Sequence, residues 1–178
     1  MKFSKLSTRD LILIALCAAI SGVTYTLLGQ PWLALSTAFG PLGGAALGLF
    51  QYGHLIAFAF VPRPGVALTV SILSTTTQFL IGDPTGIAVL GWGVAHGLGA
   101  ELVFAISRYR SPNFAVFFLA AGLGAAFGQM FSLYLYGWED TSQIFIASLF
   151  VVFIASGIES GGLSYFVNQA ILRRSKPD

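Results

Sequence analysis

Charged residues are scarce in this sequence. They make up 9% of its 178 residues, whereas hydrophobic residues make up 56%. Soluble domains carry roughly 25% charged residues, so the composition excludes an ordinary soluble protein. No polar run is long enough to form a separate soluble module. We therefore predict one membrane-embedded domain over residues 1–178, surrounded by lipid and without a nucleic-acid partner.

The motifs of several enzyme classes are also missing. The sequence contains neither a GxxxxGK[ST] phosphate-binding loop nor an HExxH motif, so the chain does not bind ATP through such a loop. Cys17 is the only cysteine, which excludes a disulfide framework. With one cysteine and two histidines on separate predicted helices, an ordinary metal site is improbable, and no cofactor is expected. An enzymatic function is therefore disfavoured.

What the sequence does contain is a succession of apolar stretches long enough to cross a membrane. A spanning helix needs about 17–25 mostly apolar residues. Turn signals such as Gly29-Gln30-Pro31 and Pro62-Arg63-Pro64-Gly65 separate the stretches. Six spans fit, at about 11–28, 39–61, 66–81, 86–107, 113–136 and 143–172. The fold class predicted is an all-α membrane protein, a six-transmembrane-helix bundle.

Positive charge is absent from one side of this bundle. Once the six spans are threaded, all nine lysines and arginines fall on the same side. The opposite side carries Asp83, Glu139 and Asp140. Because basic residues mark the cytoplasmic side of membrane proteins, we expect both the N-terminus and the C-terminus to be cytoplasmic.

Glu101 and Glu159 are the only charged residues inside the predicted spans. A carboxylate is costly in hydrocarbon and is expected to face the bundle interior, a polar cavity or a bound partner. For Glu101 we predict a contact with a ligand. The alternative is a structural hydrogen bond, with Arg108 as one candidate partner two turns away on the same face. For Glu159 a structural or coupling role is favoured.

Further aromatic and polar residues complete a predicted ligand site. Trp92 and His96 are four residues apart and share a helix face, and Gln51 and His54 lie one turn apart. The predicted ligand contacts are Trp32, Gln51, His54, Gln78, Trp92, His96, Glu101 and Gln129. Anchoring at the membrane interface is the alternative for the tryptophans, and packing is the alternative for the histidines. Aromatic rings with a few amides, imidazoles and a carboxylate suit a small heteroaromatic or cationic ligand.

Small residues recur four apart in several spans, which lets helix backbones approach closely. The pairs include Ala15/Ala19, Gly93/Gly97, Gly124/Gly128 and Gly157/Gly161. Packing inside the bundle is expected for the glycine pairs. For Ala15 and Ala19, an interface with a partner subunit is the competing interpretation.

One stretch resembles a known family. The segment GLGAELVFA at residues 97–105, followed by Arg108-Tyr109-Arg110, is similar to the YkoE family of substrate-binding (S) components of energy-coupling factor (ECF) vitamin transporters. Further matches are FGPL at 39–42, PGVAL at 64–68, GDPTG at 82–86, and Ser156-Gly157 with Gly161 and Leu163. Together these matches cover most of the chain in the right order.

The resemblance implies a multi-pass S component in the cell (plasma) membrane of a prokaryote. Such a subunit binds thiamine or its hydroxymethylpyrimidine precursor from outside, and works with a membrane T subunit and two cytoplasmic ATPase subunits. Ala15 and Ala19 would then meet the T subunit. The family often carries glutamate where this chain has Gln78, and glutamine where it has His96, and both departures bear on the substrate.

Two other functions compete with a thiamine-binding S component. One is an S component for a different small heteroaromatic vitamin, and the other is a stand-alone secondary carrier. Carriers with inverted repeats should show matching broken helices in their two halves, and no convincing internal repeat is visible in the sequence. A membrane scaffold or an intramembrane enzyme would leave the buried polar residues without a small ligand.

Overall fold

The computed structural model describes residues 5–40, 49–110, 113–137 and 142–174. Within these ranges the chain forms α1 (Thr8–Phe39), α3 (Tyr52–Phe60), α4 (Val66–Ile81), α5 (Ala88–Ile106), α6 (Phe114–Tyr136) and α7 (Gln143–Arg174). Helices α1, α5 and α6 and residues 143–170 of α7 are long and apolar enough to cross a membrane, and α4 is a shorter apolar helix. The prediction of an all-helical membrane protein is confirmed.

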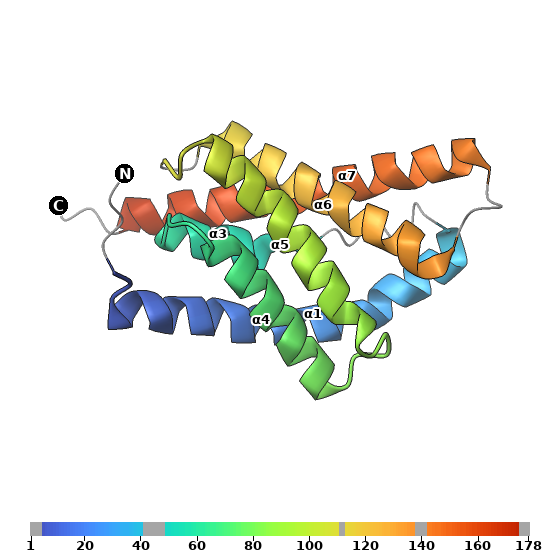
Figure 1. The fold of residues 1–178 in the computed structure, drawn as a ribbon, viewed down its shortest axis with the longest axis horizontal. Helices are drawn as coiled ribbons and strands as arrows, with labels where there is room; N and C mark the ends of the chain where they lie inside the picture. The colour runs from blue at the N-terminus through green and yellow to red at the C-terminus, as the bar shows by residue number, and fades with distance from the viewer. Residues whose placement is uncertain (1–4, 41–48, 111–112, 138–141, 175–178) are drawn as a thin grey trace.

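Successive long helices run in opposite directions, with α4 and α5 oblique to α1 and α7, and the start of α1 and the end of α7 lie at the same end of the bundle (Figure 1). Arg9 is in the first turn of α1, Arg63 follows α3, and Arg108 and Arg110 follow α5 at that end. We call it the basic end. Glu139 and Asp140, expected at the opposite end, lie outside the described residues. That the basic end faces the cytoplasm stays a prediction.

The limits of the first two spans differ from the predicted ones. Helix α1 continues through Pro31 to Phe39, over 32 residues, so the predicted stop at Gly29-Gln30-Pro31 is wrong. Its axis bends in the second half (Figure 1), as a proline inside a helix causes. The span predicted over 39–61 is not one continuous helix, because α3 begins only at Tyr52 and has nine residues.

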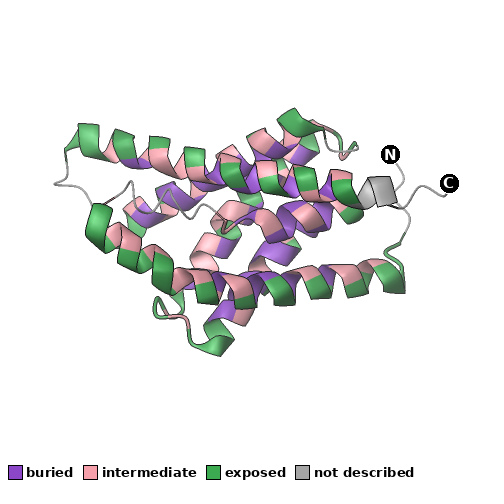
Figure 2. Cartoon of the chain, turned by 180° about the vertical axis from the view of Figure 1, so that it is seen from behind, coloured by how far each residue is buried: buried purple, intermediate pink, exposed green. Residues whose placement is uncertain are grey.

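Helix α3 lies between its neighbours in the interior of the bundle. Helices α1, α4, α5, α6 and α7 pack in that succession, and α3 packs between α7 and α1 while also contacting α4 and α6. Phe58 of α3 stacks on Phe104 of α5 with 3.6 Å between the ring centroids. The buried core around this pair also contains Leu55, Ala67, Ala100, Phe117, Ala120 and Ala121. Buried residues accordingly line the inward sides of the helices (Figure 2).

Close backbone packing holds these helices together. Lipid tails are as apolar as leucine, so helices in a membrane associate through van der Waals contact more than through hydrophobic burial. The glycines at 93, 97, 124, 128, 157 and 161 are all buried, which confirms the packing role predicted for them. Gly99 of α5 lies directly against the backbone of α6. A Cβ atom at this position would be 2.6 Å from both the Cα of Gly124 and the carbonyl oxygen of Leu123.

We therefore expect Gly99→Ala to destabilise the bundle by about 1–3 kcal/mol, the usual cost of overpacking. The atoms it would meet are backbone atoms, which cannot rotate away. Gly122→Ala is the matched control, because its nearest new contact would be 3.7 Å from the Cγ2 of Ile154. Thermal unfolding in one detergent compares the two. Equal melting temperatures would contradict the close α5–α6 contact.

Candidate functional site

The start of α3 lies inside the bundle, where its backbone amides need partners from the protein. The first four N–H groups of a helix have no partner within the helix. The backbone N–H of Gln51 donates to Oγ of Ser160 on α7 at 3.3 Å, and the N–H of Gly53 donates to the hydroxyl of Tyr25 on α1 at 3.0 Å. Three helices thus meet where the short helix begins.

Several buried polar atoms at the start of α3 and on its neighbour α6 have no hydrogen-bond partner in the described part of the chain. They are Oε1 of Gln51, Nε2 of His54, and both amide atoms of Gln129. Gln129 is 0% exposed and His54 is 1% exposed. Because buried polar side chains are normally hydrogen-bonded, each such atom calls for an explanation, and a bound ligand is one.

His96 belongs to the same region. A methyl group on Gly128 would overlap the His96 imidazole, and one on Gly124 would overlap Oε1 of Gln51. The two glycines of α6 therefore make room for both side chains, and the His54 ring is near enough to interact electrostatically with His96. Gln129 follows Gly128 on α6 and is buried. Gln51, His54, His96 and Gln129 were all predicted as ligand contacts, and we call these four residues the central polar cluster.

Trp92, Gln78 and Trp32 lie outside this cluster, with partners of their own. The indole Nε1 of Trp92 donates to Oγ of Ser132 at 2.9 Å, and the amide of Gln78 donates to Asp83 at 3.1 Å. Trp32 packs edge-on against Phe50 with 6.4 Å between the ring centroids. The structure therefore divides the predicted contacts into those with unpaired polar atoms and those that already have partners.

Glu101 binds backbone groups near the basic end. Its Oε1 accepts from the N–H of Gly65 at 2.6 Å, and its Oε2 accepts from the N–H of Leu68 at 3.4 Å. The carboxylate thereby caps α4, whose positive N-terminal dipole favours an anion. Its side-chain partner is Tyr109, whereas the side chain of Arg108 is exposed. These contacts fit the predicted structural alternative for Glu101, with a different partner.

Tyr109 completes this arrangement just after α5. Two causes raise the pKa of Tyr109 to about 12: burial is the larger, and the neighbouring Glu101 carboxylate is the second. The phenol therefore keeps its proton at neutral pH. Arg108 and Tyr109 have left-handed backbone angles, with φ of 56° and 53°. Glycine is the residue that normally occupies that region. The hydrogen bond from the Tyr109 hydroxyl to the Glu101 carboxylate helps to hold this turn.

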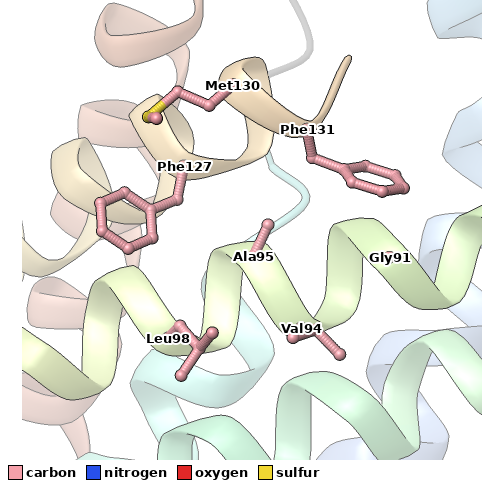
Figure 3. A pocket seen from close by; sticks show the side chains of 7 residues that line it. All are labelled: Gly91, Val94, Ala95, Leu98, Phe127, Met130 and Phe131. Atoms are coloured by element: carbon pink, nitrogen blue, oxygen red, sulfur yellow. The ribbon is translucent and has the colours of Figure 1, made fainter. Parts of the chain in front are cut away.

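A separate apolar groove lies between α5 and α6 (Figure 3). Its volume is about 420 Å³, and its lining is Gly91, Val94, Ala95, Leu98, Phe127, Met130 and Phe131. Val94, Leu98 and Met130 are exposed on the outside of the bundle. The groove has no charged or hydrogen-bonding side chain in its lining, so it offers no specificity for a polar ligand and suits lipid tails.

Ser160, Tyr25 and Tyr109 hold the candidate site in place and were missed by sequence reasoning. Ser160 and Tyr25 matter because α3 starts inside the bundle, whereas the sequence pattern predicted a continuous helix over 39–61. Tyr109 is within the Arg108-Tyr109-Arg110 motif, but its phenol reaches back to Glu101 on the preceding helix. Within the described residues, no group of three or more histidines, cysteines or acids is placed to hold a metal ion.

Three comparisons with known proteins bear on the family and the fold. Residues 9–128 match the family described as "ABC-type cobalt transport system, permease component". A crystal structure of an S-component of an ECF transporter superposes with a TM-score of 0.88 at 23% identity, over 96% of this chain and 87% of that one. A Bacillus subtilis (strain 168) protein that carries the provisional name HMP/thiamine permease protein YkoE is 27% identical over 157 residues, 87% of this chain and 78% of its own.

The bundle is therefore a multi-pass membrane transport component with the fold of an ECF S component, and not an enzyme. The chain belongs to the ABC-type cobalt transport system permease component family. This family assignment concerns the class of transport system. The feature of the structure that bears on the substrate is the central polar cluster.

Replacing Glu101 by glutamine should separate its two predicted roles. The change keeps the volume but removes the charge that the amides of Gly65 and Leu68 bind. Hydrogen bonds to charged groups contribute about 1.5–3 kcal/mol, so we expect a lower melting temperature and a ligand affinity within a few fold of wild type. Both quantities are measured on the same purified variant. A tenfold or greater loss of affinity at unchanged melting temperature would place Glu101 in the ligand site instead.

Proposed function

We propose that this chain is the substrate-binding (S) component of an ECF importer that binds thiamine or its hydroxymethylpyrimidine precursor. The observation that carries the proposal is the central polar cluster, with four unpaired atoms in its buried side chains. Unpaired amides cost free energy in the empty protein and are satisfied when a polar ligand enters. ATP hydrolysis would be supplied by two ATPase subunits, coupled through a membrane T subunit.

The chemistry of the cluster favours the pyrimidine part of the ligand. Gln129 offers one donor and one acceptor, Gln51 offers an acceptor, and His54 offers a ring nitrogen. An aminopyrimidine presents the complement, namely an amino group that donates and ring nitrogens that accept. The cluster itself contains no carboxylate, so it provides no counter-charge for the thiazolium cation of thiamine. The proposed occupant of the cluster is therefore the neutral ring.

The broken second span supports a binding role of this kind. In membrane proteins, non-helical backbone at membrane depth is tolerated where it is buried in protein or lines a cavity. A secondary carrier with inverted repeats would need a matching broken helix in its other half. Helices α5, α6 and α7 are unbroken over 19, 23 and 32 residues. This difference favours the S component over the stand-alone carrier.

The proposed contact with the T subunit lies on α1. Ala15 and Ala19 are both exposed, one turn apart, while Ile14 and Ala18 face the interior. Two small exposed residues four apart form a shallow face on which another helix can lie closely. With the basic end in the cytoplasm, this face would be in the half of the membrane nearer the ATPase subunits.

We expect Gln129→Leu to weaken ligand binding without destabilising the empty protein. The leucine keeps the approximate volume and removes two unpaired polar atoms. The affinity for hydroxymethylpyrimidine should fall about tenfold or more, the effect of losing one or two hydrogen bonds. Fluorescence quenching of Trp92, followed by equilibrium titration, measures the affinity, and thermal unfolding measures the stability.

Met130→Leu is the matched control for this test, because Met130 is the next residue on α6 and is 58% exposed. Titration with thiamine, hydroxymethylpyrimidine and the thiazole half separates the parts of the ligand. Saturable binding of the first two, and not of the third, is expected. Absence of saturable binding for all three in the wild-type chain would refute the proposed substrate, and saturation by another heteroaromatic vitamin would establish the alternative.

Replacing Ala15 or Ala19 by tryptophan should block assembly with the T subunit while ligand binding stays unchanged. The indole would hold apart two helices that the small residues allow to touch. Leu27→Trp is the control on the same helix, since Leu27 is 70% exposed and lies further from the basic end. Copurification of the T subunit with the tagged chain is the measurement. Normal recovery with both alanine variants would remove this face from the interface.

A further inference from the structure

Glu159 has an unusual position on α7. The next residue, Ser160, is 0% exposed and faces the interior, as do Ser164 and Asn168. Glu159 is on the other side of the helix and is exposed, with the exposed residues Ala155 and Leu163 one turn before and one turn after it. Figure 2 shows exposed residues recurring along this outward side of α7. The carboxylate therefore points away from the bundle.

Glu159 is within residues 143–170 of α7, the part of the helix that is long and apolar enough to cross a membrane. The ring of Tyr165 packs against that of Phe114, the first residue of α6, with 5.2 Å between the centroids. Tyr165 thus marks the level at which α6 begins at the basic end. At about 1.5 Å per residue, Glu159 lies about 9 Å deeper than Tyr165 and about 24 Å from Gln143 at the other end of α7. A glutamate side chain is shorter than either of these distances.

An outward carboxylate in hydrocarbon needs a partner that lipid tails cannot provide. Charged residues within spans are rare, and they pair with one another or face the protein interior. The described packing partners of α7 are α6 and α3. The buried residues that meet them, among them Gly157 and Gly161, lie on a different side of the helix from Glu159. Within the described residues Glu159 has no hydrogen bond or ion pair. A pairing group would therefore come from another molecule that reaches the same depth.

The sequence itself excludes a second copy of this chain as the source of a cation. None of its nine lysines and arginines falls within the six predicted spans. Two copies meeting at this face would bring no positive side chain to the level of Glu159. The ATPase subunits are cytoplasmic and do not reach into the membrane. Among the proposed partners, only the T subunit has transmembrane helices.

We propose that Glu159, flanked by Ala155 and Leu163, is a docking surface for a transmembrane helix of the T subunit that presents an arginine or lysine side chain. Ala155 leaves space for that helix to approach, and Glu159 supplies the charge that its cation pairs with. This inference rests on the proposed assignment as an S component, and it is independent of which vitamin is bound.

The test uses the full chain, tagged and coexpressed with the T and ATPase subunits of the same organism. Glu159→Leu should lower the amount of T subunit recovered at least about tenfold, because it leaves the partner's cation buried and unpaired. Glu159→Gln keeps a hydrogen-bond acceptor and should lower recovery less. Val151→Leu is the control, since Val151 is 67% exposed on the same helix and carries no charge.

The isolated variants distinguish docking from folding. If Glu159 faces a partner, Glu159→Leu leaves ligand affinity unchanged and does not lower the melting temperature of the isolated chain. Unchanged recovery of the T subunit with Glu159→Leu would overturn the proposal, and so would a lower melting temperature of the isolated variant. If the wild-type chain recovers no T subunit, the S-component assignment fails together with this surface.

Discussion

The start of α3 inside the bundle is the constraint on which the rest of the structure depends. In a membrane interior no water is present to bind free backbone amides, so they must find partners in the protein. Ser160 of α7 and Tyr25 of α1 accept from the amides of Gln51 and Gly53. These bonds fix three helices relative to one another, and they hold Gln51, at the start of α3, against Gly124 of α6.

Much of the fold follows from composition and turn chemistry. Apolar length predicted the helices from α4 to α7 to within a few residues, and the basic residues of the described ranges do gather at one end. Hydropathy does not report whether an apolar stretch is continuous, so the same signal fitted one long second span. Nor does it report that Pro31 bends α1 without ending it. Both errors concern whether the backbone hydrogen bonds of a helix continue or stop. Contacts with neighbouring helices decide this, and the sequence pattern does not show them.

The site was predictable in part for a similar reason. Polar residues in apolar spans must find partners, which selected Gln51, His54, His96 and Gln129. The sequence could not tell which polar residues satisfy one another. Glu101 binds the amide of Gly65, 36 residues away in sequence, and Gln78 binds Asp83 in the following turn. Only the fold distinguishes those satisfied groups from the unpaired atoms that are left for a ligand.

Helix α7 connects the two proposed surfaces through adjacent residues. Ser160 holds the backbone of Gln51 at the central polar cluster, while Glu159 faces outward from the same turn. Gly157, one turn earlier, lets α7 approach so closely that a Cβ atom there would lie 2.6 Å from the carbonyl oxygen of Ala121 and 2.9 Å from Nε2 of Gln51. Close-packed interiors transmit small displacements because they contain few voids. A partner that shifts or rotates α7 at Glu159 would therefore move Ser160 and Gly157 against Gln51, so that docking of the partner and occupancy of the cluster would be linked through one helix turn.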